Sequence, residues 1–496
     1  MKSTLSTFKK GSASLDHAYG EALQRVESQP GDDPKLAKKV LSWITYAKRP
    51  LTTTEICCAL AVDPGDADLD RENVPDIDDL VTVCAGLVVV DPESGIIRLV
   101  HYTTQDYLER IGTEWNPDAQ LNIARTCLTY LSFDTFKSGG CSSAEDFEER
   151  LRQNEFLNYA AKHWGEHTVT VQDDLNIREM ASSFLTDNKL VFCATQVIEM
   201  EDMKPFFYES LPGIGQRQIQ AKGSTGLHLV ARCGWCSLLE VSLEALKNEE
   251  ILAAFDFRDS RDHTPLTLAA TCGHDEMVNL LLEKGANVNM KGGVYGSALQ
   301  AASFIGHGQV VKLLLDHGAD VNIQGGHYGS ALQAASFIGH EQVVKLLLDH
   351  GANVNMKGGY YNSALQAASF IGHGQVVKLL LDYGADVNTI QGGLFYGSAL
   401  QAASANGHEQ VVKLLLDYGA NVNMKGGVYD SALEAASTGG HKQVVKLLLD
   451  HGANVNMKGG YYNSALQAAS AEGHEQIVKL LLQKGAIASE EYSGTL

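Results

Sequence analysis

Seven histidines recur at one position of a repeated sequence, and histidine is the commonest metal ligand among side chains. They are His274, His307, His340, His373, His408, His441 and His474. If each stands on its own helix, stacked helices lie roughly 8–10 Å apart, whereas zinc holds its nitrogen ligands at about 2 Å. Adjacent histidines therefore cannot share one metal ion, and we expect them to make structural hydrogen bonds.

A second pattern, His163-Trp-Gly-Glu-His167, matches the H-x-x-E-H arrangement of some zinc peptidases. There, two histidines one helical turn apart bind the metal and the glutamate acts as base. Gly165 weakens the helix that would carry the pattern, and no acidic ligand stands out downstream. A zinc metallopeptidase is kept only as an alternative. We expect no enzyme activity, and no catalytic or metal site.

The cysteines and glycines offer no cofactor site. The chain has nine cysteines, an odd number at irregular spacing, which indicates reduced thiols. One pair, Cys233-Gly-Trp-Cys236, has C-x-x-C spacing, but no second pair exists to complete a zinc site. No Gly-Lys dipeptide occurs, so the chain lacks the loop that cradles nucleotide phosphates. We expect no cofactor.

The charge balance limits the classes of partner. The formal net charge is −21 over 496 residues, and both halves of the chain are acidic. Without a basic face, the chain has no electrostatic basis for tight binding to nucleic acid or to an anionic membrane. The N-terminus lacks a signal-peptide core, and the longest nearly apolar run, Leu80 to Val90, is too short to cross a bilayer. We expect a cytoplasmic protein, with the nucleus not excluded.

The elements that position the seven histidines are copies of one unit. Ser297-Ala-Leu-Gln-Ala-Ala-Ser-Phe-Ile-Gly-His307 returns at Ser330 and Ser363, and then with changes, at a period of 33 residues with one spacing of 35. Such a period means one supersecondary unit per repeat, stacked on its neighbours. A serine cap begins a short helix, Gly-His turns the chain into a second helix, and a Gly-Gly pair predicts a hairpin to the next unit.

Helix, turn, helix and hairpin at this period resemble the ankyrin repeat. The resemblance covers Thr225 to about Ala488, with one degenerate unit followed by seven clear ones. Thr264-Pro-Leu-Thr267 and Thr225-Gly-Leu-His228 are similar to the T-P-L-H opening of the family, and later repeats carry Ser-Ala-Leu-Gln instead. The resemblance implies a curved, non-catalytic solenoid whose concave side binds another protein.

The N-terminal part predicts three helices and two strands. Lys35 to Arg49 has a helical pattern, Thr52-Thr-Thr-Glu55 is a capping box, and Ile77 to Ala85 is a third helix. Leu87 to His101 contains two strands joined by a turn sequence. Three helices and such a wing indicate a winged helix. Because the third helix begins with Asp76, Asp78 and Asp79, which repel phosphate, we expect this domain to pack against protein rather than to bind DNA.

Lys35 to Leu51, together with Leu99-Val-His-Tyr-Thr-Thr-Gln-Asp-Tyr-Leu108, resembles the winged helix of fungal NLR-like (STAND) ankyrin proteins, a domain also labelled after GPI inositol-deacylase. In that family it follows a nucleotide-binding NACHT module. Phe156-Leu-Asn-Tyr-Ala-Ala-Lys-His-Trp164 resembles the helical segment that comes next. Met1 to about Arg25 resembles the tail of a NACHT module, so we expect either a shortened relative without the module itself or a truncated gene model.

We therefore expect a mainly α chain with a winged-helix-like N-terminal domain, a helical linker domain and a C-terminal ankyrin solenoid. The expected boundaries are 1–30 for the NACHT remnant, 31–115 for the winged helix, 116–222 for the helical linker, 223–488 for the repeats and 489–496 for a polar tail. The favoured function is non-catalytic protein binding in fungal NLR-like recognition or signalling. The alternative is an adaptor that recruits a client to a separate enzyme.

The expected binding face lies in the first half of the array. Three repeats place Phe-Ile before Gly-His, whereas the next three place Ala-Asn, Thr-Gly and Ala-Glu there. The predicted partner-binding residues are Phe304, Ile305, Phe337, Ile338, Phe370, Ile371, Val294, His327, Tyr360 and Phe395. Exposed phenylalanines and isoleucines favour a protein ligand on the concave face. Alternatively, the pairs are core residues, or residues 116–220 fold back over them.

Tyrosines follow the Gly-Gly turn of successive hairpins. They are Tyr295, Tyr328, Tyr361, Tyr396, Tyr429 and Tyr462. Because they recur unchanged at one position of every repeat, they predict a ladder of rings that reach one another along the array and stabilise it.

Overall fold

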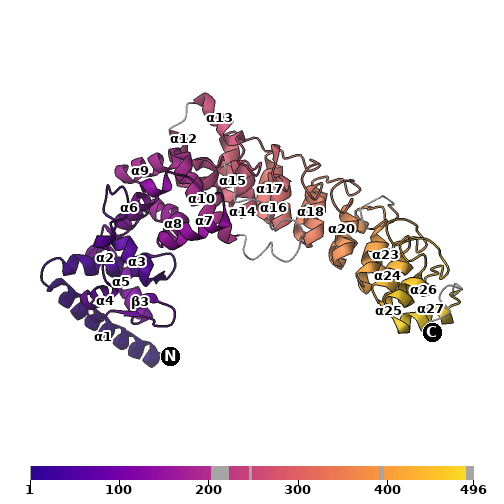
Figure 1. Cartoon of the computed structure of the whole chain (residues 1–496), viewed down its shortest axis with the longest axis horizontal. Helices are drawn as coiled ribbons and strands as arrows, with labels where there is room; N and C mark the ends of the chain where they lie inside the picture. Colours follow the sequence, from indigo (N-terminus) through magenta and orange to yellow (C-terminus); the bar gives the residue numbers. More distant parts are fainter. Residues whose placement is uncertain (1, 203–222, 245–247, 390–395, 488–496) are drawn as a thin grey trace. The chain divides into compact units, whose positions relative to one another are not determined.

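A computed structural model describes residues 2–202, 223–244, 248–389 and 396–487 of the 496-residue chain. The chain divides into two compact units, Met1–Ala254 and Phe255–Leu496. The first contains the winged helix and a helical region, and the second contains repeated helix pairs, which follow one another in sequence order in Figure 1. This agrees with the mainly α fold that the sequence predicts.

Helix α1 (Lys2–Glu27) precedes the winged helix. The described residues of the winged helix form a small sheet and the helices α2 (Asp33–Tyr46), α3 (Thr53–Leu60), α4 (Ile77–Val83) and α5 (Tyr102–Trp115), with a 3-10 turn at Arg71–Asn73. Its strands are β1 (Leu51–Thr52), β2 (Val88–Val90) and β3 (Ile96–Leu99). The sheet order is β1-β3-β2, antiparallel throughout, with Leu51 opposite Ile97 and Val88 opposite Leu99.

The predicted capping box begins α3. Thr52 Oγ1 accepts a hydrogen bond from the backbone N–H of Glu55 at 3.2 Å, and Glu55 Oε2 accepts one from the N–H of Thr52 at 2.9 Å. Arg49 forms an ion pair with the same carboxylate at 2.5 Å, which holds the largely buried Glu55 in place. Strand β1 lies directly before this cap and was not predicted, because two residues carry no periodic pattern.

The rest of the first unit is helical. Its elements are α6 (Ala119–Leu131), a 3-10 turn at Asp134–Phe136, α7 (Ala144–Gln153), α8 (Leu157–Val169), α9 (Leu175–Thr186), α10 (Asn188–Asp202), α11 (Gly226–Cys233), α12 (Cys236–Glu244) and α13 (Asn248–Asp256), which ends in the second unit. Buried rings join the two regions: Trp43 lies edge-on to Phe156 at 5.5 Å, and Phe156 edge-on to Tyr130 at 5.2 Å. All nine cysteines are free, in line with the reduced thiols expected from their spacing.

The described residues of the second unit form seven helix pairs. They are α14 (Pro265–Cys272) with α15 (Asp275–Glu283), α16 (Ala298–Ile305) with α17 (Gly308–Asp316), α18 (Ala331–Ile338) with α19 (Glu341–Asp349), α20 (Ala364–Ile371) with α21 (Gly374–Asp382), α22 (Ala399–Ala405) with α23 (Glu409–Asp417), α24 (Ala432–Thr438) with α25 (Lys442–Asp450), and α26 (Ala465–Ala471) with α27 (Glu475–Gln483). Small alanines of the first helices and valines and leucines of the second form the core, which is why neighbouring units pack closely.

The hairpins form β-structure at few places. Strands β4 (Lys291–Gly292) and β5 (Gly296–Ser297) pair in the first hairpin, and single bridges join Gly325 to Gly329 and Tyr396 to Gly427. The other predicted hairpins are tight turns in the described part of the array.

Asparagine side chains add contacts between neighbouring repeats. Asn355 Nδ2 donates to the carbonyl of Gly384 at 3.2 Å, and its Oδ1 accepts from the N–H of Asp386 at 2.8 Å.

Candidate functional site

Aromatic side chains from successive repeats form one continuous column of rings. The ring column comprises Tyr295, Phe304, Tyr328, Phe337, Tyr361, Phe370, Tyr396 and Tyr429. Up to Tyr396, successive ring centroids lie between 4.8 and 5.6 Å apart. The predicted ladder of tyrosines therefore exists in an altered form, because a phenylalanine of a first helix lies between each pair of tyrosines as far as Tyr396.

The hairpin backbone brings these rings together. Gly326 has φ +62°, a conformation that glycine adopts without strain. A Cβ atom on Gly326 would lie 2.0 Å from the carbonyl oxygen of Tyr295 in the preceding hairpin. Glycine is therefore required both by the turn and by the close approach of stacked hairpins, and this approach sets the ring spacing.

A second row of side chains occupies the hairpin tips. The hairpin-tip row comprises Val294, His327, Tyr360, Val428 and Tyr461. The N–H of His327 donates to the carbonyl of Val294 at 2.9 Å, and the N–H of Tyr360 donates to that of His327 at 3.1 Å. The rings of His327 and Tyr360 are stacked, with centroids 5.3 Å apart and planes 20° apart. Both side chains are exposed, as is Val294.

The predicted partner-binding residues differ in exposure. Ile305 and Ile371 are 38% and 36% exposed, Val294 is 55% exposed and Tyr360 is 37% exposed. Ile338 is half-buried, as are the three phenylalanines of the ring column. Phe395 lies outside the described residues, as do residues 203–220 of the segment expected to fold back. The isoleucines and the hairpin-tip row thus offer more free apolar surface than the phenylalanines.

The column is uncharged, and the face around it has few charges. Burial raises the pKa of the Tyr328 hydroxyl to about 12, and burial likewise raises that of Tyr361. Among the described residues between Lys291 and Tyr429, neither the first helices nor the segments around the Gly-Gly turns carry an aspartate or glutamate, and Asp320 and Asp386 lie earlier in two of the links between repeats. The exposed lysines of these hairpins are Lys291, Lys357 and Lys425. In a chain of net charge −21, this face therefore lacks the acidic character of the whole.

The repeated histidines make the structural hydrogen bonds that the sequence predicts. His340 Nε2 lies 3.1 Å from the carbonyl oxygen of Phe304 in the preceding repeat, and His373 Nε2 lies 3.1 Å from that of Phe337. The same contact recurs from His307 to His474 at 2.9 to 3.1 Å. The accepting carbonyls lie in the last turns of the first helices, so these rings satisfy carbonyls at helix ends and join neighbouring repeats.

The H-x-x-E-H pattern lies on α8, but its two histidines face different partners. His163 Nδ1 contacts Glu166 at 2.8 Å. His167 is fully buried, with Nε2 2.8 Å from the Tyr159 hydroxyl and Nδ1 3.1 Å from Gln120 Oε1. Burial lowers the pKa of His167 to about 3, so it is neutral. Both ring nitrogens of His167 are engaged in hydrogen bonds, and this arrangement supplies no lone pair for a metal shared with His163.

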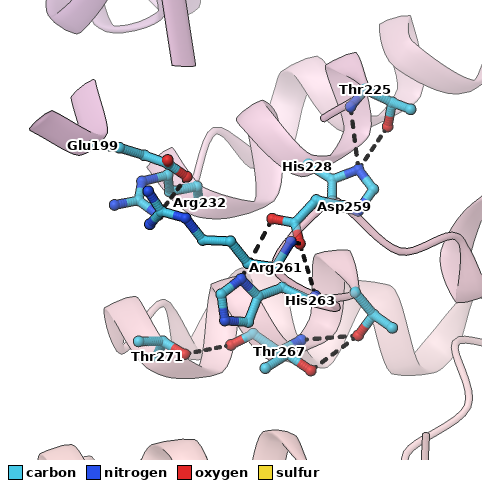
Figure 2. Close-up of polar contacts among 10 residues, drawn as sticks. Glu199, Thr225, His228, Arg232, Asp259, Arg261, His263, Thr267 and Thr271 are labelled. Atoms are coloured by element: carbon cyan, nitrogen blue, oxygen red, sulfur yellow. Dashed lines mark hydrogen bonds and ion pairs between the residues drawn. The ribbon is translucent and has the colours of Figure 1, made fainter. Parts of the chain in front are cut away.

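Three further polar pairs, shown in Figure 2, contain titratable groups near the beginning of the repeats. They are Thr225 with His228, Glu199 with Arg232 at 3.6 Å, and Asp259 with His263 at 3.3 Å. The first pair caps α11, and Asp259 also accepts the backbone N–H of His263 at 2.8 Å, which closes a turn before α14. These contacts therefore have structural roles. Within the described residues, no group of three or more His, Cys, Asp or Glu could hold a metal ion.

Two family models match the chain and agree with this architecture. Ankyrin repeats (three copies) match residues 198–292, 298–391, 355–426 and 400–492, and the winged helix domain of GPI inositol-deacylase matches residues 28–118. No curated protein matches the chain. Among solved structures, the chain is similar to the ankyrin repeat domain of human ASB11, with 29% identity over 46% of this chain and 100% of that one, at a TM-score of 0.40.

No helix in the described ranges is both long and apolar enough to span a membrane. The repeats are of a kind that suggests protein–protein interaction. Because the ankyrin matches cover more than half of the sequence, the chain belongs to the ankyrin-repeat family, and it carries a winged-helix domain of the GPI inositol-deacylase type.

Proposed function

We propose that the array binds a segment of another protein on the face formed by the ring column, the hairpin-tip row and Ile305, Ile338 and Ile371. The observation that supports this is the exposure of aliphatic and aromatic side chains at matching positions of adjacent repeats, 36% to 55% for Ile305, Ile371, Val294 and Tyr360. Soluble proteins rarely expose contiguous apolar surface unless a partner covers it.

The charges on this face favour one kind of partner segment. Lys291 and Lys357 are exposed in hairpins that carry no carboxylate. A segment whose apolar residues are flanked by Asp or Glu would complement both features. Three repeats extend over about 20 Å, which an extended chain covers with about six residues. The binding segment is therefore short, apolar and acidic.

The proposed context is fungal NLR-like recognition or signalling. Its support is the combination of a winged helix of this type with ankyrin repeats in one chain, because the NLR-like ankyrin proteins that the sequence resembles carry the same pair of domains. In this role the array recognises a ligand and the winged helix packs against protein.

A phage-displayed library of random peptides, selected on the immobilised full-length chain, tests the binding face. The selected peptides should be rich in apolar residues and in Asp or Glu. They should lose binding to the double variant Ile305→Asp/Ile371→Asp. The matched control is Leu482→Asp, which changes an equally exposed apolar residue on the second helix of the last repeat and should leave binding intact. Peptides that bind the double variant as well as the natural chain would show that the face lies elsewhere.

A further inference from the structure

Glutamines of three first helices, α16, α18 and α22, connect to the next hairpin, whereas Gln366 Nε2 of α20 has no hydrogen-bond partner among the described residues. Gln300 Nε2 donates to the carbonyl of Gly325 at 2.8 Å, and Gln333 Nε2 donates to that of Gly358 at 2.8 Å. Gln401 makes the same kind of bond to the carbonyl of Met424 at 3.2 Å. In each case the amide hydrogen joins one repeat to the following one, so the bond needs a donor at this position.

Glu434 occupies this position in the sixth clear repeat. Its side chain is 2% exposed, and its Oε1 accepts a hydrogen bond from the backbone N–H of Tyr462 at 2.9 Å. The carbonyl of Gly459 stands where Gly325 and Gly358 stand in the earlier pairs. An ionised carboxylate has no hydrogen to donate to such a carbonyl, whereas a protonated one has. The protonation state of Glu434 therefore decides whether the glutamine pattern is reproduced.

A second acid lies beside it. Asp430, at φ +54°, replaces the Gly or Asn found at this hairpin position in the other clear repeats after Met290, and it pairs with Lys425 at 3.5 Å. The next hairpin approaches both acids closely: a Cβ atom on Gly459 would lie 2.0 Å from Asp430 Oδ2, and one on Gly460 would lie 2.4 Å from Glu434 Oε2. The last repeat is thus packed directly on two carboxyl groups.

The elements around Glu434 carry other titratable groups. The two hairpins and the turn after α26 contribute Tyr429, Lys425, Asp430, Lys458, Tyr461, Tyr462, Glu472 and His474. Helix α25, which packs against α24, carries Lys442, Lys446 and Asp450. His474 contacts the carbonyl of Thr438 at the end of α24. Helix α22, which packs on the other side of α24, carries no titratable side chain.

We propose that Glu434 makes the attachment of the last ankyrin repeat pH-sensitive. The neutral carboxyl group of Glu434 stabilises the packing of the last repeat on the array, and the ionised carboxylate weakens this packing. Burial raises the pKa of Glu434 from 4.5 to about 7, and the charge of Asp430 adds to this effect, while the N–H of Tyr462 opposes it. Because the folded pKa lies above the unfolded one, the stabilisation is complete below about pH 4.5 and is lost as the pH rises through about 7.

Hydrogen exchange of the full-length chain, followed by mass spectrometry, measures this attachment. The rates are corrected for the intrinsic pH dependence of exchange. In peptides from α26 and α27, protection should fall about tenfold between about pH 6 and about pH 8, because opening of the last repeat exposes Glu434 to water and restores its ordinary pKa. Peptides from α16 and α17 provide the internal reference.

Two variants test the assignment. Glu434→Gln restores the residue of the other repeats, so protection of the last repeat should become high and lose the tenfold pH effect, while the histidines nearby remain unchanged. In the double variant Gln401→Glu/Glu434→Gln, the pH effect should move to α24 and α25. The proposal is overturned if Glu434→Gln retains the natural pH dependence, if the natural chain shows none, or if the transplanted glutamate does not move it.

Discussion

The ring column makes a specific prediction for Phe337. Its ring lies 5.3 Å from that of Tyr328 and 4.8 Å from that of Tyr361, with an interplanar angle of 25° to the latter. Each such pair contributes about 0.5–1.5 kcal/mol beyond the burial of its area. The half-buried phenyl group adds about 1 kcal/mol of lost burial when it is removed. Phe337→Ala should therefore destabilise the array by about 2–4 kcal/mol.

Urea unfolding of the full-length chain, followed by far-ultraviolet circular dichroism, measures this loss. The matched control is Ile305→Ala, which truncates a side chain that is 38% exposed and that takes no part in the ring column. It should cost less than about 1 kcal/mol, since much of its surface is already hydrated. Phe337→Leu keeps apolar volume but removes the ring, so its loss of unfolding free energy should lie between those of Phe337→Ala and Ile305→Ala.

The reasoning is refuted if Phe337→Ala is no more destabilising than Ile305→Ala. Phe337 would then be a surface side chain without a structural role. If the prediction holds, replacing Phe304, Phe337 and Phe370 together with serine would break the column at three points, so any loss of binding would follow from lost folding. Substitution of the isoleucines is therefore the cleaner test of binding.

Three further predictions concern contacts elsewhere in the chain. Asn355→Ala removes two hydrogen bonds between repeats and should cost about 1–2 kcal/mol in urea unfolding. Ser369 is fully buried and its hydroxyl has no hydrogen-bond partner, so Ser369→Ala should leave the free energy of unfolding unchanged or raise it by up to about 1 kcal/mol. The control Ser470→Ala loses a hydrogen bond to the carbonyl of Leu466 and should not stabilise the array. The pKa of His167 is about 3 in the folded chain and 6.5 when unfolded, so its contribution to stability is present above about pH 6.5 and is lost as the pH falls toward 3. His167→Gln removes this titration. The slope of unfolding free energy against pH in this window should therefore fall by about 1.4 kcal/mol per pH unit.

Much of the fold could be predicted because local signals and the repeat period agree. Ser330 accepts a hydrogen bond from the N–H of Gln333 at the start of α18, and Gly339 ends that helix at φ +93°. Both roles follow from residue type at one position, and the period repeats them. Strand β1 had no such signal, since its pairing with β3 joins residues that lie 44 or more positions apart in the sequence.

The ring column was predicted in part, for a geometric reason. The repeat period correctly predicts that the tyrosines lie on successive hairpins. It carries no information about the distance in space between a hairpin and the end of the first helix that follows it. Phe304 follows Tyr295 by nine positions in the sequence, yet its ring contacts both Tyr295 and Tyr328. The burial of the phenylalanines and the exposure of the isoleucines depend on that three-dimensional contact. Sequence spacing alone therefore predicted that the phenylalanines and the isoleucines form one exposed surface.

Departures from the repeat show how the array changes along its length. Where Ala405 replaces phenylalanine, no ring separates the flanking tyrosines, and Tyr396 and Tyr429 contact each other directly at 6.2 Å, a longer spacing than elsewhere in the column. Beyond this point Asp430 and Glu434 appear. Identical repeats make the same contact at every interface and so contribute stability without distinguishing one interface from another. The residues that break the pattern therefore divide the array into an apolar first half, which we propose as the binding face, and a second half that contains the proposed proton-sensitive interface.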